Sequence, residues 1–597
     1  MSKTTKKWSA ARTSYDFMSD SRRKNGGFFT HEISGGVTPR LKKMHSNRFF
    51  RFTRSIYNLL CHISTRAYGT ALLCFGILGT LMYFIRLSAD TSIATPIVGI
   101  LFACLSVPFL LVDKPLPIFL QDFKPTDYLF FEFFCMKRHS AMESEKRFPA
   151  FVAMIIGFAP AALSYKIPLW QIAVAIGAVV FIYIGLQSPE FIFLTSLVCL
   201  PFIRFLPHSD LVFALAILLA LVSFIRKVIY GRRIFFIEQY DIIIALMMMC
   251  ILASGIFVKG EESLFGSIKI ILVAVAYLLA GNIITNRRLA ELSANSIILS
   301  GVITSLVSVV QFILVMSRVG KAVTADDLSS ILARLDGVAA LLMVSTVFAV
   351  GMAGQGGRAR GLFVLFSTLC VIALVLSGEF FAVSALVLGM GAYAVIKSNR
   401  APGLILPVLL AATVLLLFLP TGVLNFLFEY SPSVVSSEIL FDIWNKSAGL
   451  IVDHPFFGIG IGTESFAQEM ASMGLVGYPD SSNLFIELAL EAGIIAPIFF
   501  LLLIMTRMRH CSIQYLYVRN SQMERMANLS GAALFCMLAF GMVNYIWSDT
   551  SAYYLFWCVF GIGSASLRVA KRDYDDRVIY YEESSAHDSS VIDIEIG

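Results

Sequence analysis

The chain has 597 residues, of which 57% are hydrophobic and only 15% are charged. A soluble chain carries about 25% charged residues, so this composition excludes a soluble globular protein and indicates a polytopic membrane protein. The net charge of +7 is uneven, because residues 1–67 hold 14 Lys and Arg against 3 Asp and Glu. This asymmetry concerns membrane topology and gives no sign of nucleic-acid binding. The ten cysteines show no disulfide framework and no metal-binding spacing.

Residues 1–67 have no sustained apolar period, and we expect a basic, disordered cytoplasmic tail there. A helix needs about 20 apolar residues to cross a bilayer, and the sequence contains sixteen such runs. The predicted fold is therefore all-α, a polytopic helical bundle of about 16 transmembrane helices. The runs lie near residues 68–88, 91–112, 149–165, 168–186, 189–206, 209–226, 241–257, 268–285, 294–317, 337–354, 359–376, 379–396, 402–419, 483–505, 526–547 and 552–568.

The distribution of Lys and Arg between the runs predicts the orientation. The predicted inner loops are basic except for the short one around Pro189, as in the loops that hold Arg226 and Lys227, then Arg287 and Arg288. Because basic loops stay in the cytoplasm, both termini are expected on the cytoplasmic side of the membrane. The predicted organisation is an N-terminal tail (1–67), additional N-terminal helices (68–186), a core bundle (187–419), a large extracytoplasmic loop (420–482), C-terminal helices (483–568) and an acidic, disordered cytoplasmic tail (569–597).

The large outer loop carries short helices in its second half. Ile439, Leu440, Ile443, Trp444 and Leu450 recur at helical spacing, which predicts an amphipathic helix that Pro455 ends. A glycine-rich turn, PFFGIGIG, follows, and a second short helix is expected from Thr463 to Gly474. The loop holds seven carboxylates: Glu429, Glu438, Asp442, Asp453, Glu464, Glu469 and Asp480.

Two further carboxylates, Glu487 and Glu491, follow the loop in the first turns of the run at 483–505. They are four residues apart, so they share one face of a helix. Carboxylates at the mouth of a span are costly unless they are paired or face water. Two interpretations remain open: a polar site that faces the bundle interior, or a pair that reaches the membrane interface.

The stretch from Ser437 to Pro497 resembles the signature region of the O-antigen ligase and Wzy-type polymerase superfamily. That pattern has an Ile-Trp helix, a His-Pro-aromatic-Gly-x-Gly turn, and a His-Asn pair followed after nine residues by Gly. Ile443-Trp444, HPFFGIG from His454 to Gly460, Asn483, Glu491 and Gly493 match it in order and spacing. The resemblance implies a core of about twelve spans with the large loop after the ninth. If the first four spans here are an addition, the loop lies at that position.

The sequence departs from the family pattern at four places. Ser482 stands where the family has His before Asn, and Leu440 lies nearest to an expected Arg. An earlier Ser-Arg-Gly is Ser377-Gly378-Glu379, and the last Gly is Ala496. The base and some arginines of the family therefore cannot be transferred by position.

The resemblance implies a membrane glycosyltransferase that moves a glycan from a polyprenyl-pyrophosphate carrier to a hydroxyl group of a glycan or lipid acceptor. Such a site needs a base and cations for the leaving pyrophosphate, but no metal or other cofactor. Asp480, Glu487 and His454 are the candidate bases, and a structural role for His454 or a capping role for Asp480 remains open. The candidate substrate-binding residues are Arg204, Arg318, Lys321, Arg334, Trp444, Lys446, Ser482, Asn483 and Glu491.

Two other functions remain open. One is a transporter or flippase of lipid-linked envelope glycans, and the other is a non-catalytic scaffold of an envelope polysaccharide complex. Few charged residues lie within the apolar runs, and no Gly- or Pro-broken pair of runs recurs in the two halves, which disfavours transport. The expected partners are the lipid-linked donor, the acceptor, membrane lipid and envelope polysaccharide assembly proteins, without nucleic acid.

Overall fold

The computed structural model describes residues 31–33, 60, 62–85, 94–133, 150–165, 167–203, 209–229, 234–258, 261–319, 336–354, 359–397, 437–475, 478–517 and 522–595. This part of the chain is helical except for one small sheet. Strands β1 (His31–Ile33) and β2 (Phe235–Ile237) pair antiparallel in it, with His31 opposite Ile237. The protein is thus a helical membrane protein, as the composition predicted.

The helices follow the apolar runs of the sequence. Those of the N-terminal part are α4 (Thr65–Ile85), α5 (Ala94–Leu111), α6 (Leu116–Asp122), α7 (Lys124–Thr126), a π-helical turn (Asp127–Phe133), α8 (Ala150–Ala162), a 3-10 turn (Leu163–Tyr165) and α9 (Leu169–Gln187). The bundle contains α10 (Pro189–Ile203), α11 (Ser209–Ile229), α12 (Gln239–Phe257), α13 (Glu261–Ile283), α14 (Arg287–Val319), α16 (Asp336–Ala353), α17 (Arg360–Leu376) and α18 (Phe380–Lys397). The C-terminal part contains α21 (Ser437–Asp453), α22 (Thr463–Ser472), α23 (Leu484–Ala492), α24 (Ile495–Tyr517), α25 (Gln522–Gly541), a 3-10 turn (Ile546–Ser548) and α26 (Thr550–Glu595).

Within the described ranges, six helices are long and apolar enough to cross a membrane, and seven shorter apolar helices accompany them. The predicted run near 402–419 lies outside the described residues, so a total of about sixteen crossings stays a prediction. The prediction of a single helix over residues 483–505 is wrong, because two helices, α23 and α24, occupy this range. Gly493 adopts a positive φ of 79° and separates α23 from α24, a conformation that only glycine adopts at low cost.

The predicted disordered tails also differ from the structure. Within residues 1–67, β1 pairs with β2 and α4 begins at Thr65. At the other end α26 continues to Glu595 instead of stopping near residue 568. The sequence has no Gly or Pro between Ser564 and Ile596, so it lacks the residues that most strongly end a helix.

Helix α26 lies at the centre of the bundle and contacts α13, α25, α14 and α16. Its membrane-length part is 94% buried, and Trp557 packs there among Trp547, Phe556 and Phe560. Small residues allow the helices to approach closely, as is common in membranes. A side chain on Gly561 would lie 2.7 Å from the carbonyl oxygen of Tyr277 on α13.

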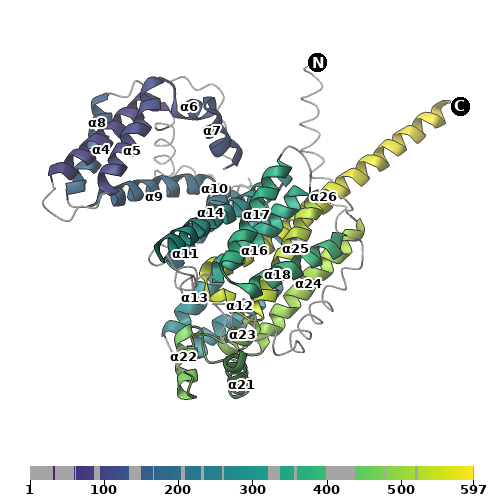
Figure 1. Cartoon of the computed structure of the whole chain (residues 1–597). Helices are drawn as coiled ribbons and strands as arrows, with labels where there is room; N and C mark the ends of the chain where they lie inside the picture. Colours follow the sequence, from purple (N-terminus) through teal and green to yellow (C-terminus); the bar gives the residue numbers. More distant parts are fainter. Residues whose placement is uncertain are drawn as a thin grey trace.

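The N-terminal helices form a second group beside the bundle (Figure 1). Helices α4, α5 and α8 pack together, and α9 connects them to α10 and α11. Gly76 of α4 lies close against Gly99 of α5. A Cβ added to Gly76 would be only 2.5 Å from the carbonyl oxygen of Gly99. These additional helices therefore have a compact interface of their own.

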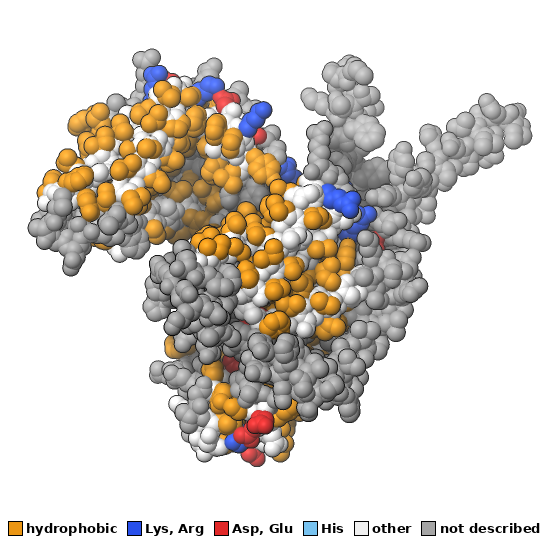
Figure 2. All heavy atoms as spheres, in the orientation of Figure 1, with side chains coloured by type: hydrophobic (Ala, Val, Ile, Leu, Met, Phe, Trp, Pro, Cys, Tyr) orange, Lys and Arg blue, Asp and Glu red, His pale blue; other side chains and the backbone are white. Residues whose placement is uncertain are grey.

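The bundle has two distinct ends. Helices α21, α22 and α23 lie at one end, and the C-terminal end of α26 extends from the other (Figure 1). Figure 2 shows hydrophobic side chains along the bundle between them and a group of acidic side chains at the foot of the molecule, near α21. The short helices and the C-terminal end of α26 therefore lie at opposite ends of the bundle.

Candidate functional site

The amphipathic helix predicted in the outer loop is α21, and its apolar face is buried. Ile443 and Leu450 pack with Phe466 and Met470 of α22 and with Leu490 of α23. Lys446, on the outer side, donates to Asp442 and to the carbonyl oxygen of Met473, both at 3.0 Å. These contacts join the three short helices into one unit.

The glycine-rich turn after α21 is locked against α23. The Ile459 amide donates to the carbonyl oxygen of Leu490 at 2.7 Å, and the Ile494 amide donates to that of Pro455 at 3.0 Å. Gly458 has a φ of 68°, and a Cβ there would lie 2.0 Å from the Leu490 oxygen. Gly458 and Gly493 are therefore needed both for their backbone angles and for the space that a side chain would occupy.

Helix α23 carries the two carboxylates that the sequence placed on one face. Glu487 is 1% exposed and Glu491 is 7% exposed. Glu487 accepts a hydrogen bond from the Ser481 amide at 2.7 Å, and Glu491 accepts one from the Tyr545 hydroxyl at 2.9 Å. Of the two interpretations of this pair, the structure favours the site inside the bundle.

The third carboxylate is Asp480, in the turn before α23. It accepts a hydrogen bond from the Ser482 amide at 2.9 Å, a side-chain turn that Asp commonly forms with the residue two positions later. Ser482 has a φ of 52° and is the one non-glycine residue with a positive φ among those described. Such backbone strain persists where the surroundings hold it, often at functional sites.

Burial disfavours the charged form of all three carboxylates, which we call the carboxylate cluster (Asp480, Glu487 and Glu491). With nine residues, α23 is too short to cross a membrane. Burial raises the pKa of Glu487 well above its usual range, and the charges of Glu491 and Asp480 raise it further. Burial also raises the pKa of Asp480, although hydrogen bonds from Ser482 lower it. The pKa of Glu491 is raised by burial to about 7, despite opposing effects from Tyr545, the Gly462 amide and Lys269.

Asn483 and Trp444 support the turn that holds the cluster. The Asn483 side chain caps α23 by accepting from the amides of Phe485 and Ile486, and it donates to the carbonyl oxygen of Met542. Asp480 is therefore not the helix cap. The Trp444 indole donates to the carbonyl oxygen of Ser481 at 3.0 Å. Both residues fix the backbone between Asp480 and Glu487.

Of the other candidate residues whose side chains the structure describes, His454 and Lys446 do not join the cluster. His454 is exposed after α21, and none of the hydrogen bonds of the described residues joins its side chain to the three carboxylates. Lys446 contacts α21 and α22 instead. Arg204, Lys321 and Arg334 lie outside the described residues, and Arg318 lies on α14 without a described side chain. The described residues contain no group of three or more His, Cys, Asp or Glu that could hold a metal ion.

Sequence reasoning missed two residues of the site. Tyr545 lies 54 positions from its partner Glu491, so no local pattern could link them. Lys269, on α13, is close enough to lower the pKa of Glu491. A lysine within an apolar run was a usable signal, because charged residues in spans are costly and usually functional.

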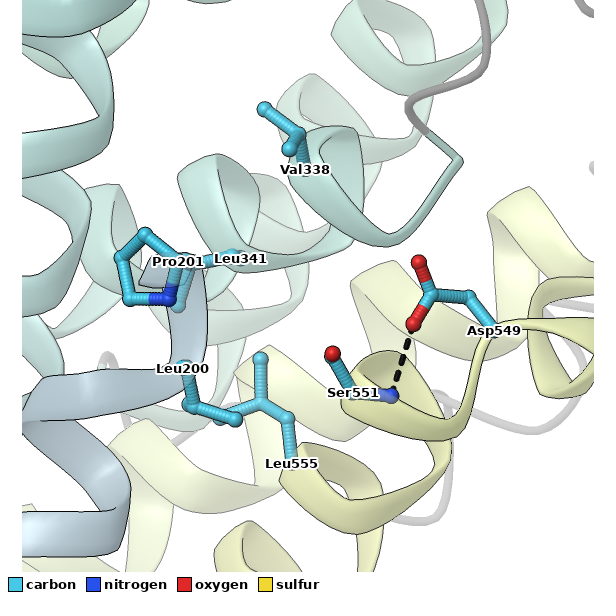
Figure 3. Close-up of a pocket in the computed structure, with 7 residues that line it drawn as sticks. All are labelled: Leu200, Pro201, Val338, Leu341, Asp549, Ser551 and Leu555. Carbon is cyan, nitrogen blue, oxygen red and sulfur yellow. Dashed lines mark hydrogen bonds between the residues drawn. The ribbon is translucent and has the colours of Figure 1, made fainter. Parts of the chain in front are cut away.

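A cleft lies between α10, α16 and the start of α26 (Figure 3). Leu200, Pro201, Val338, Leu341 and Leu555 give it an apolar lining, and Asp549 accepts a hydrogen bond from the Ser551 amide at its edge. Arg204 follows Pro201 closely in sequence, and Arg334 precedes Val338. Two of the predicted pyrophosphate-binding residues thus adjoin this cleft in sequence.

Residues 362–501 match the family model described as O-antigen ligase. This segment includes α17, α18 and the unit of α21 to α23 with the carboxylate cluster. No curated protein matches the chain. Over this segment, the helical membrane protein is similar to the O-antigen ligase family.

Proposed function

We propose that the chain is a membrane glycosyltransferase. It transfers a glycan from a polyprenyl-pyrophosphate carrier to a hydroxyl group of a glycan or lipid acceptor on the outer face of a bacterial cytoplasmic membrane. The observation that carries this proposal is the carboxylate cluster, which lies within the O-antigen ligase domain and at the end of the bundle opposite the C-terminus of α26.

In the proposed reaction, the acceptor oxygen attacks the anomeric carbon of the glycan. The bond between this carbon and the pyrophosphate oxygen breaks, and the lipid pyrophosphate leaves with the electron pair. The proton of the acceptor hydroxyl passes to a base. No metal or cofactor is needed for these steps.

Asp480 suits the role of base best among the three carboxylates. Its pKa is raised toward neutral pH by burial, which favours proton transfer under working conditions. It is partly exposed, whereas Glu487 and Glu491 are buried. A carboxylate has about four acceptor positions, so the bonds from Ser482 leave Asp480 able to accept from a substrate hydroxyl.

Glu487, Glu491 and Ser482 act mainly by positioning. Glu487 fixes the Ser481 amide, and Ser482 holds Asp480. Glu491 is held by Tyr545 near Lys269. The leaving pyrophosphate requires cations, and Arg204, Arg318, Lys321 and Arg334 are proposed for this role.

Mass spectrometry of polyprenyl-linked glycans in a strain without this protein tests the proposal. Single repeat units on the outer leaflet would identify a polymerase, and a long lipid-linked polymer without acceptor conjugate would identify a ligase. Restoration by the unaltered chain, but not by Asp480→Asn, is expected. Glycolipid trapped on the inner leaflet would support a transporter instead, and an unchanged glycan profile would contradict an envelope-glycan function.

A further inference from the structure

The glycine-rich turn after α21, which packs against α23, carries an unusual apolar surface. Phe456 is 67% exposed and Phe457 is 42% exposed. Phe257, at the end of α12, is 66% exposed, and its ring lies 4.7 Å from that of Phe457. Ile494 is 48% exposed beside Pro455. We call these four residues the phenylalanine patch (Phe257, Phe456, Phe457 and Ile494).

The backbone of the turn is fixed, so these side chains cannot easily withdraw from the surface. The amide bonds from Ile459 to Leu490 and from Ile494 to Pro455 hold the turn on both sides. A Cβ added to Gly493 would lie only 2.3 Å from the carbonyl oxygen of Phe456, so the two backbone segments are packed closely. Each phenylalanine left in water forgoes about 2 kcal/mol of burial energy. Two rigidly exposed phenylalanines therefore need an apolar environment.

The patch continues the apolar outer surface of two helices in the bundle. Helix α12 is one of the membrane-length helices, and it exposes Met249 and Ile256 before Phe257. Helix α24, which contacts α12, exposes Ile498 and Leu502 after Ile494. A surface of this kind on a spanning helix faces acyl chains. The turn thus lies at the same depth as the end of a membrane-length helix.

We propose that the turn from Pro455 to Ile459 is inserted into the outer leaflet of the bilayer, with lipid acyl chains covering the phenylalanine patch. Gly458 lies directly against the backbone of Glu491 and Leu490, so the inserted turn packs against the outer side of α23. Insertion would hold the carboxylate cluster at the level of the lipid headgroups. The inference does not depend on which reaction the cluster performs.

Photocrosslinking in lipid nanodiscs tests this proposal with the full chain. p-Benzoylphenylalanine replaces Phe456, or Phe457 in a second variant, in nanodiscs of phosphatidylcholine and phosphatidylglycerol. Ile498 on α24 is the lipid-facing control and exposed Ser472 on α22 is the aqueous control. Irradiation followed by mass spectrometry of the intact protein measures the fraction that carries one lipid.

We expect lipid adducts at positions 456 and 457 at a yield close to that at 498 and several-fold above that at 472. A yield at both positions equal to that at 472 would overturn the proposal. Crosslinks from both positions to another peptide of the same chain would also overturn it, because protein would then cover the patch. Thermal unfolding of each variant is compared with that of the unaltered chain to establish that the variant is folded.

Discussion

The two ends of the bundle hold their buried carboxylates in different ways. At the end where α26 leaves the bundle, Glu238 pairs with Arg568 at 2.8 Å, and both side chains are at least 85% buried. The Arg568 guanidinium also lies over the Phe236 ring at 4.1 Å and donates to the carbonyl oxygen of Ile284. At the other end, the hydrogen bonds to Glu487 and Glu491 come from neutral groups, the Ser481 amide and the Tyr545 hydroxyl.

This difference distinguishes an ion pair from the carboxylate cluster, for which we propose a catalytic role. A buried ion pair with further hydrogen bonds balances its own charges and joins α12, α13 and α26. At the carboxylate cluster, burial raises the pKa of all three groups and so favours their protonated forms. We therefore place the proposed proton transfer at the carboxylate cluster.

The largest expected effect on stability comes from breaking the ion pair. Arg568→Gln leaves Glu238 charged and buried, which we expect to lower the free energy of unfolding by about 3 kcal/mol. Unfolding by SDS in mixed micelles measures the change. Arg66→Gln is the control, because the pair of Arg66 and Asp113 is more than half exposed and should contribute less than about 1 kcal/mol.

Adding Glu238→Gln to Arg568→Gln removes the stranded charge and should recover part of the loss. If Arg568→Gln costs no more than the Arg66 control, the contrast between the two ends of the bundle is wrong.

A smaller loss is expected from Gly493→Ala. The alanine must adopt a φ of 79° and clash with the Phe456 carbonyl, which we expect to cost about 2 kcal/mol. The same unfolding assay measures it. Gly449→Ala on α21 is the matched control, because a Cβ added there would meet nothing within 4 Å. This substitution should leave the free energy of unfolding unchanged or raise it slightly. Equal effects of the two substitutions would contradict the locked turn.

The smallest expected loss is that of Tyr545→Phe, about 1 kcal/mol. The hydroxyl lowers the pKa of Glu491 and so favours its charged form. The loss should therefore grow as pH rises through about 7, the pKa of Glu491. Unfolding measured from pH 6 to pH 8.5 checks this dependence. Tyr554→Phe, which loses a hydrogen bond to Ser196, is the control, and a pH profile for Tyr545→Phe that parallels it would exclude the coupling to Glu491.

Burial of Glu491 also predicts how the unaltered chain responds to pH. Its pKa is raised from about 4.3 in an unfolded chain to about 7, so between these values the folded state retains a proton that the unfolded state releases. Its contribution to stability therefore falls as pH rises across this window. Glu491→Gln should reduce this slope, whereas Glu469→Gln, on the exposed face of α22, should not.

Hydropathy and the spacing of apolar residues predicted most of the helices and the buried face of α21. They could not reveal the break at Gly493, because both sides of it are apolar. The shared face of Glu487 and Glu491 followed from helical spacing alone. The roles of Asn483 and Tyr545 depend on contacts with Met542 and Glu491, 59 and 54 residues away, and the sequence left open a capping role for Asp480 that Asn483 fills. Long-range contacts of this kind leave no period in a sequence.

The most direct test measures glycan transfer by purified Asp480→Asn in proteoliposomes with a lipid-linked glycan donor. We expect the rate to fall about 100-fold or more, as removal of a general base does, with unchanged thermal unfolding. Asp453→Asn, an exposed carboxylate at the end of α21, should keep the full rate. A folded Asp480→Asn protein that transfers glycan at the unaltered rate would contradict the assignment of the carboxylate cluster as the catalytic site.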